Sequence, residues 1–285
     1  KLEKYSKHIY VVTLLILSYT VFWGYELNGS SCWLSLGPFM INFVSITPLL
    51  FTIAFAGIFA KWHWDSITRD FQALALFLAP LLLILSAPSL TAAVIYTAAC
   101  IVLMTVSGGK LRSILFITSP VIFAVLLLAV LAPQWLAKSF IFLNPAQDPL
   151  GAGYLNMQLS EVLSSSGYLG QGLSFAPGML PDLHTDFIFA FITYTFGWTA
   201  SILLIALIIV FLVRVALIAK QVKTSYAKLL ISGIVGLLTL QFLWHIAMNL
   251  GIAPIAAVGL PFISYGGSQL VINAAAVGII LSIYR

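Results

Sequence analysis

The sequence alternates long apolar runs with short polar connections, and the runs have the length of membrane-spanning helices. A helix needs about 20 apolar residues to cross about 30 Å of hydrocarbon. Eight runs meet this requirement, at roughly 9–25, 39–60, 71–87, 90–106, 113–132, 187–212, 226–248 and 268–284. The pattern therefore predicts an all-α, polytopic membrane helix bundle that forms a single transmembrane domain over residues 1–285.

Composition and charge agree with this interpretation. With 61% hydrophobic residues, 7% charged residues and a mean hydropathy of +1.09, the chain is excluded from the soluble globular class. The net charge of +5 does not indicate a nucleic-acid partner, because the basic residues stand singly between apolar runs. That distribution is typical of the basic residues that face the cytoplasm in membrane proteins.

The distribution of charges also predicts the orientation. If the N-terminus is cytoplasmic, twelve of the 13 basic residues lie on the inner side, and Lys138 alone lies outside. The acidic residues on the outer side are Glu26, Asp148, Glu161, Asp182 and Asp186. One span more or fewer would reverse every later loop, so the asymmetry supports both the span count and the orientation. We expect the chemistry on the outer face of a plasma membrane.

The outer loop at about 133–185 is far longer than the other connections, and loops of that length are usually functional or disordered. This one contains a short amphipathic pattern through Met157, Val162 and Leu163, which predicts a helix. Gly170 and Gly172 follow, and glycines permit tight turns or a close approach of backbone to a ligand. As a phosphate-binding motif they are weak, so plain turns are the favoured interpretation.

A cluster of polar residues marks the end of this loop. Asp182, His184, Thr185 and Asp186 lie within five positions, just before a very apolar helix. Partial desolvation of Asp186 at the membrane boundary would raise its basicity and suit it to take a proton from a sugar hydroxyl. The alternative is that the two Asp and Thr185 cap the helix. The local pattern leaves both interpretations open.

The last outer connection ends in Ser264-Tyr265-Gly266-Gly267-Ser268. Irregular backbone at membrane depth is tolerated only where protein or a wet cavity satisfies it, so a cavity-lining re-entrant turn is one hypothesis. An ordinary loop with a serine cap on the final helix is the other. His245, near the outer end of the seventh run, receives no catalytic role.

Few residues suggest a cofactor. Cys32 and Cys100 fall in different settings, and no spacing of metal ligands occurs. The sequence specifies no cofactor and leaves open whether a divalent cation assists. The chain begins at Lys1 and runs at once into an apolar segment, so we expect a fragment that lacks upstream helices.

Four motifs, in order, resemble the SEDS family of bacterial cell-wall polymerases, which includes RodA, FtsW and SpoVE. They are Asn144-Pro145 through Asp148-Pro149-Leu150-Gly151-Ala152-Gly153-Tyr154, then Gly170-Gln171-Gly172, then His184-Thr185-Asp186-Phe187-Ile188-Phe189-Ala190, and finally Leu260-Pro261-Phe262-Ile263-Ser264-Tyr265-Gly266-Gly267-Ser268. The match covers mainly 138–285, and the first outer loop around Trp33 matches more weakly. The family has ten spans, so the eight here correspond to its third through tenth.

The resemblance implies a glycosyltransferase that polymerises the lipid-linked disaccharide-pentapeptide lipid II outside the membrane, together with a class B penicillin-binding protein. Asp186 matches the essential Asp of the family and would act as the base. Lys138 matches a family Arg that would face the leaving pyrophosphate. The further substrate-binding candidates are Trp33, Gln158, Gly170, Gly172, Asp182, His184, Thr185 and the residues Ser264, Tyr265, Gly266, Gly267 and Ser268.

The chain departs from the family pattern at several polar positions. The family usually has Glu where Asp182 stands, a Glu-Glu-Leu-Gly run where Tyr194-Thr195-Phe196-Gly197 stands, and Asn where His245 stands. These losses keep two alternatives open. One is a non-catalytic scaffold that binds lipid-linked precursor or a penicillin-binding protein. The other is a transferase or flippase for a different undecaprenyl-linked saccharide.

Overall fold

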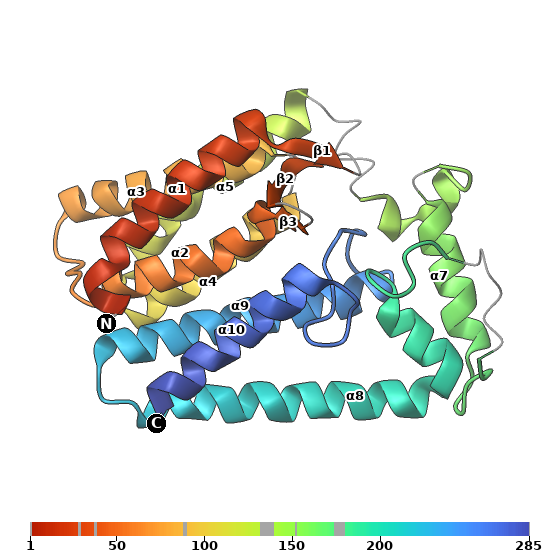
Figure 1. The fold of residues 1–285 in the computed structure, drawn as a ribbon. Coiled ribbons are helices and arrows are strands. Elements are labelled where there is room, and N and C mark those ends of the chain that lie inside the picture. The colour runs from red at the N-terminus through yellow and green to blue at the C-terminus, as the bar shows by residue number, and fades with distance from the viewer. Residues whose placement is uncertain are drawn as a thin grey trace. The chain divides into compact units, whose positions relative to one another are not determined.

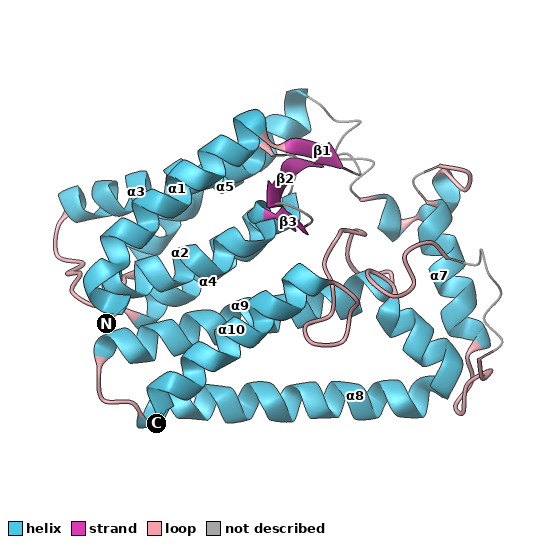
Figure 2. Cartoon of the chain, viewed as in Figure 1, coloured by secondary structure: helices cyan, strands magenta, loops and turns pink. Residues whose placement is uncertain are grey.

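The structure is a computed structural model that describes residues 2–27, 30–36, 39–87, 90–131, 140–151, 153–173 and 180–284 (Figure 1). Nearly every element is a helix, as the colouring of Figure 2 shows. The α-helices are α1 (Ser6–Trp23), α2 (Phe43–Phe59), α3 (Ile67–Ser86), α4 (Leu90–Val106), α5 (Leu111–Leu131), α7 (Tyr154–Ser165), α8 (Ile188–Gln221), α9 (Ser225–Asn249) and α10 (Gly267–Tyr284). Three short 3-10 helices are η1 (Leu2–Tyr5), η2 (Ile141–Leu143) and η3 (Pro145–Gln147).

Each of the eight apolar runs contains an α-helix, which confirms the predicted all-α, polytopic fold class. Five helices, α1 with its preceding turn and α3, α8, α9 and α10, are long and apolar enough to cross a membrane. Three shorter apolar helices lie within α2, α4 and α5. The amphipathic pattern in the long loop also forms the predicted helix, α7, and buries Val162 and Leu163.

The predicted start of the second run was wrong. The run at 39–60 does not begin as helix, because residues 39–42 form a strand and α2 begins at Phe43. Asn42 supplies the reason, since its side chain accepts a hydrogen bond from the Ser45 N–H at 3.3 Å and so caps the helix.

A small antiparallel sheet stands between α1 and α2, where the sequence pattern predicted no strands. It consists of β1 (Tyr25–Leu27), β2 (Ser30–Leu36) and β3 (Phe39–Asn42), in that order. The backbone of Trp33 pairs with Tyr25 on one side and Asn42 on the other. The sheet adds a minor element to an otherwise helical chain.

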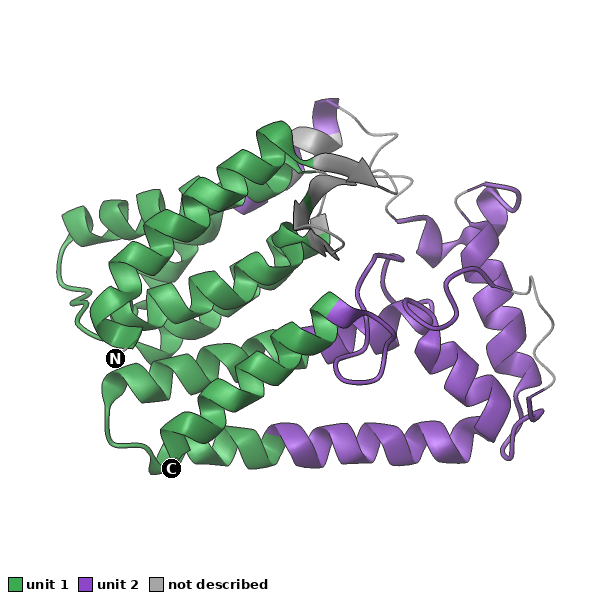
Figure 3. Ribbon diagram, in the orientation of Figure 1, with its two compact units in different colours: residues 1–120, 213–240, 268–285 green, residues 121–212, 241–267 purple. Residues whose placement is uncertain are grey.

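The described residues form two compact units, coloured separately in Figure 3. The first unit comprises residues 1–120, 213–240 and 268–285. Its core includes an aromatic cluster in which the rings of Phe77 and Tyr96 stack with centroids 5.5 Å apart. The hydroxyl of Tyr96 donates to the Phe77 carbonyl at 3.0 Å, and that of Tyr10 donates to the Leu76 carbonyl at 2.9 Å. Buried aromatic rings are thus held without a lost hydrogen bond.

The second unit comprises residues 121–212 and 241–267, and it contains most of the predicted site. Its core joins the apolar face of α7 to the start of α8. The buried members of this core are Leu159, Val162, Leu163, Leu180, Phe187, Ala190 and Tyr194. Helix α7 of the long loop therefore packs as a part of this unit.

Candidate functional site

A tight turn before α8 holds the polar cluster that the sequence singled out. The backbone carbonyl of Asp182 accepts hydrogen bonds from the N–H groups of Thr185 at 3.0 Å and Asp186 at 3.1 Å. It also accepts one from the Thr185 hydroxyl at 3.1 Å. Asp182 has a φ of 49°, in the left-handed region that Asp tolerates better than most residues. The turn closes on the Asp182 carbonyl, and no N–H group of a described residue donates to either carboxylate.

The loop before α10 is fastened to this turn. The Ser264 hydroxyl donates to the Thr185 carbonyl at 2.6 Å and accepts from the Leu260 N–H at 2.6 Å. The Tyr265 N–H donates to the His184 carbonyl at 2.7 Å. Two motifs about 80 positions apart in the sequence are therefore in direct contact. Both contacts are made to backbone carbonyls of the turn, while the side chains of His184 and Tyr265 remain exposed.

Asn249, the last residue of α9, fixes the turn from another side. Its side-chain amide donates to the Asp186 carbonyl at 3.0 Å and to the His245 carbonyl at 2.8 Å. Its oxygen accepts from the Ala190 N–H at 3.2 Å, in the first turn of α8. Asn249 is completely buried, and two of these three bonds set the positions of Asp186 and of the first turn of α8.

Sequence reasoning missed Asn249 and gave His245 no role. The two lie four positions apart on α9, so they share one face of that helix. His245 is completely buried, and its Nδ1 lies 2.6 Å from the Val258 carbonyl in the loop before α10. Two polar side chains on one face of an apolar helix were the available signal, because such groups in membrane helices are rare and usually engaged.

The Asp186 carboxylate combines partial burial with the lack of a committed partner. No described residue donates a hydrogen bond to it, although its backbone is held on two sides. Burial, and to a lesser extent the like charge of the Asp182 carboxylate, raises the pKa of Asp186 to about 6. A carboxylate with that pKa is ionised near neutral pH and is a stronger base than an ordinary Asp. It is suited to take a proton from a hydroxyl.

Helix α8 is broken at Gly197, and the loop at 167–172 forms hydrogen bonds with the backbone groups on either side of the break. Gly197 has φ 82° and ψ 172° inside α8, where the helix changes direction. The Gln171 N–H donates to the Tyr194 carbonyl at 2.8 Å, and the Trp198 N–H donates to the Gly167 carbonyl at 3.1 Å. A Cβ on Gly170 would stand 2.3 Å from the Thr195 carbonyl oxygen. Gly170 is therefore required for a close approach of two backbones.

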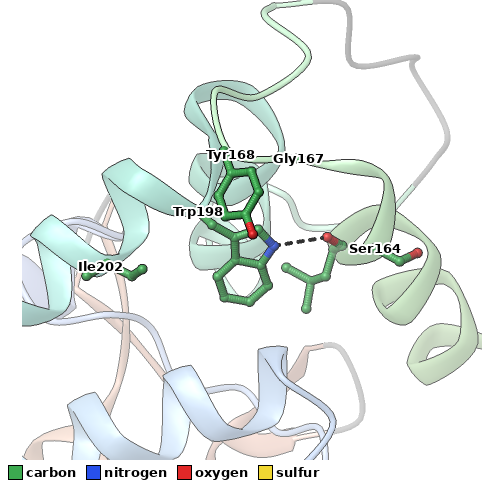
Figure 4. A pocket seen from close by; sticks show the side chains of 6 residues that line it. Ser164, Gly167, Tyr168, Trp198 and Ile202 are labelled. Carbon is green, nitrogen blue, oxygen red and sulfur yellow. Dashed lines mark hydrogen bonds between the residues drawn. The ribbon is translucent and has the colours of Figure 1, made fainter.

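An open apolar groove of about 470 Å³ lies beside this break (Figure 4). Leu163 and Ser164 of α7, Gly167 and Tyr168 of the loop, and Trp198 and Ile202 of α8 line it. The Trp198 indole N–H donates to the Leu163 carbonyl at 3.3 Å, which is the dashed line in Figure 4. This bond fixes one wall of the groove.

The other predicted residues occupy separate positions. Gln158 is half-buried on α7, and its amide donates to the Tyr154 hydroxyl at 2.6 Å. Gly172 has a φ of 74° with open space around it. Gly266 precedes α10, and Gly267 and Ser268 are the first two residues of that helix. Lys138 lies outside the described residues, as does the side chain of Trp33.

Within the described ranges, no three His, Cys, Asp or Glu side chains gather as metal ligands would. A divalent cation stays a prediction without a designated site.

The chain is similar to proteins of one family over its whole length. The sequence model of the family described as "Cell cycle protein" (FTSW_RODA_SPOVE) matches residues 1–285. "Probable peptidoglycan glycosyltransferase FtsW" of Coxiella burnetii is 33% identical over 296 residues, which cover 99% of this chain and 78% of the relative. "Stage V sporulation protein E" of Bacillus subtilis is 29% identical and matches 99% of this chain and 79% of its own length.

A solved structure gives the same result for the fold. It is described as "Structural coordination of polymerization and crosslinking by a peptidoglycan synthase complex". The likeness has a TM-score of 0.83 at 25% identity and covers 100% of this chain and 82% of the other.

Proposed function

The chain belongs to the FtsW, RodA and SpoVE family of cell cycle proteins, and we propose that it polymerises lipid II into glycan strands with Asp186 as general base. It is a multi-pass membrane protein. The observation that carries the proposal is the Asp186 carboxylate itself. Asp186 is half-buried, and the pKa of its carboxylate is raised to about 6. Asn249 holds its backbone carbonyl, whereas no described residue donates a hydrogen bond to its carboxylate oxygens.

The reaction needs one base. Asp186 takes the proton of the acceptor sugar hydroxyl as the hydroxyl oxygen attacks the anomeric carbon of the donor. The bond between that carbon and the pyrophosphate oxygen breaks, and undecaprenyl pyrophosphate leaves with the bonding electrons. A single displacement inverts an α-linked donor to a β-linked product, so no second nucleophilic carboxylate is required.

The surrounding residues support this chemistry in two ways. The exposed side chains of Asp182 and His184 flank the base and are proposed to contact the sugars. The leaving pyrophosphate requires positive charge nearby, and Lys138 is the proposed source, by its match to a family Arg. A lysine there supplies charge without the two-pronged geometry of arginine.

The proposed setting is the outer face of the bacterial plasma membrane. The basic residues of the sequence support this orientation, because twelve of 13 fall on the opposite side. A class B penicillin-binding protein is the proposed partner. The likeness to a structure described as a peptidoglycan synthase complex for polymerization and crosslinking supports that choice.

The test uses purified protein, alone and with a co-expressed class B penicillin-binding protein, supplied with labelled lipid II. We expect glycan ladders from the wild type and none from Asp186→Ala. Glu161→Ala is the matched control, because Glu161 is another carboxylate of the outer loop but is exposed on α7. It should give ladders at the wild-type rate.

Two results would redirect the proposal. Lipid II binding without ladders, unchanged by Asp186→Ala, would favour a scaffold. Ladders that persist in Asp186→Ala would show that another group is the base.

A further inference from the structure

A second, smaller cavity lies close to the backbone of Asp186. It has a volume of about 250 Å³ and is lined by Asn156, Ser160 and Leu163 of α7, by Trp198 of α8 and by the chain at 249–251. Asn249 forms part of its wall and also donates to the Asp186 carbonyl at 3.0 Å. A group bound in the cavity is therefore separated from the main chain of the base by a single side chain.

Asn156 is the unusual residue of this cavity. It is 6% exposed, and its Oδ1 is buried without a hydrogen-bond partner among the described residues. The neighbours on the same buried face of α7, Leu159, Val162 and Leu163, are apolar. A leucine would fit that face at no polar cost, whereas an unsatisfied amide oxygen reduces stability. The oxygen can only accept, so its missing partner is a donor.

The other walls define the rest of the ligand group. The Ser160 hydroxyl can donate to a carbonyl, while Leu163, Trp198 and Leu250 offer apolar surface. The volume falls below the range of about 300–1,000 Å³ that holds a whole small ligand, so it suits one substituent of a larger molecule. A group with an N–H donor, a carbonyl acceptor and a methyl is an acetamido group.

We propose that this cavity binds an acetamido group of the sugar substrate, with Asn156 accepting the hydrogen bond of its N–H. The inference rests on the proposed function and deepens it, because it makes Asn156 a specificity-determining residue for N-acetylated amino sugars. The acetyl carbonyl accepts from Ser160, and the methyl lies against Trp198.

The test measures binding without turnover. Full-length protein carrying Asp186→Asn is titrated with labelled lipid II and with an analogue whose two sugars carry free amino groups in place of acetamido groups. We expect lipid II to bind about tenfold more tightly than the analogue, and we expect Asn156→Leu to reduce this ratio to about twofold or less. Comparing the ratio cancels the effect of the analogue's charge that is common to both proteins.

Two further variants serve as a control and as a second test. Glu161→Ala, an exposed change on the same helix, should leave the ratio unchanged. Ser160→Ala should weaken lipid II binding about two- to fivefold and leave the analogue unaffected. An unchanged ratio in Asn156→Leu would overturn the inference even if the wild type makes glycan ladders. A collapsed ratio in a chain that makes no ladders would uphold the cavity and refute the polymerase.

Discussion

Two aspartates at the starts of apolar helices show opposite uses of the same side chain. Asp70 is the fourth residue of α3, and Asp186 stands two residues before α8. Asp70 is 2% exposed, and its Oδ2 lies 3.5 Å from the guanidinium of Arg112. Asp186 is half-buried and has no cation beside its carboxylate among the described residues. The first carboxylate is engaged in an ion pair, and the second is available.

The two aspartates differ in which of their groups the surrounding structure binds. Around Asp70 it supplies a counter-charge to the side chain. Around Asp186, Asn249 and the adjoining turn form hydrogen bonds with the main chain. The carboxylate is left half-buried and without an ion-pair partner among the described residues. A carboxylate of the second kind reduces stability, and in a folded protein such a cost is typical of a functional site.

The largest expected effect is on the polymerisation rate, which should depend on Asp186 and not on the Asp70 ion pair. Asp186→Asn should lower the polymerisation rate by about 10²–10⁴-fold, because a general base is lost. It should not lower the free energy of unfolding near pH 7. The folded pKa of about 6 lies above the ordinary 3.8, so ionisation of Asp186 opposes folding as the pH rises from about 4 to 6, and Asn removes that penalty.

Arg112→Ala is the matched counterpart of that change. It should keep the rate and lower the free energy of unfolding by about 1–3 kcal/mol, because it leaves the Asp70 carboxylate buried and unpaired. Both variants are compared by rate and by thermal unfolding in one detergent. If Asp186→Asn or Arg112→Ala lowered the rate and the stability to the same extent, the two aspartates would not differ in role.

The next effect tests how the backbone of Asp186 is held. Asn249→Leu removes three hydrogen bonds and should lower kcat by about 10- to 100-fold with a smaller change in KM, because a base displaced by about 1 Å loses much of its effect. Asn273→Leu is the control, since Asn273 is also buried, at 1% exposure, but belongs to the other unit. If Asn273→Leu were equally slow, the loss would not be specific to the turn.

A smaller effect concerns the broken helix α8, which begins two residues after Asp186. Gly170→Ala and Gly172→Ala both place a side chain at positive φ, at 81° and 74°. At Gly170 the new Cβ also meets the backbone of α8, whereas at Gly172 it enters open space. We expect a loss of about 1–2 kcal/mol in unfolding free energy for Gly172→Ala and clearly more for Gly170→Ala. Equal thermal stabilities would show that the loop and α8 are not in close contact.

The smallest effect is a shift in pH dependence. The base must be ionised, so the rate should rise with pH through about 6 and level off above it. Asp182→Asn removes the like charge next to the base, so the midpoint should move to lower pH by less than about one unit. The measurement is the pH profile of kcat/KM for both proteins. A midpoint that stayed fixed would mean that burial alone sets the pKa.

Much of the fold could be predicted from the sequence. Apolar runs of sufficient length define the helices, and each of the eight contains an α-helix in the structure. Asp186 and the loop at 264–268 were found as separate motifs for the same reason, because polar residues are conspicuous in so apolar a chain. The start of α2 was placed too early, since an apolar strand and an apolar helix differ little over four residues.

Other parts of the site depend on contacts between distant segments. Neither the hydrogen bonds from Ser264 and Tyr265 to the turn at 184–185 nor those of Asn249 to Asp186 and Ala190 can be read from spacing. The same holds for Gly170, whose sequence context predicted a plain turn and whose actual neighbour is the break in α8.

The sequence by itself determined which segments are membrane helices and which carboxylate stands just before one of them. Only the tertiary structure decided that this carboxylate is half-buried and unpaired while its backbone is held. The reason is physical. The free energy of placing a run of side chains in hydrocarbon is summed along the chain, whereas the burial and pairing of one charged group depend on what remote segments bring beside it.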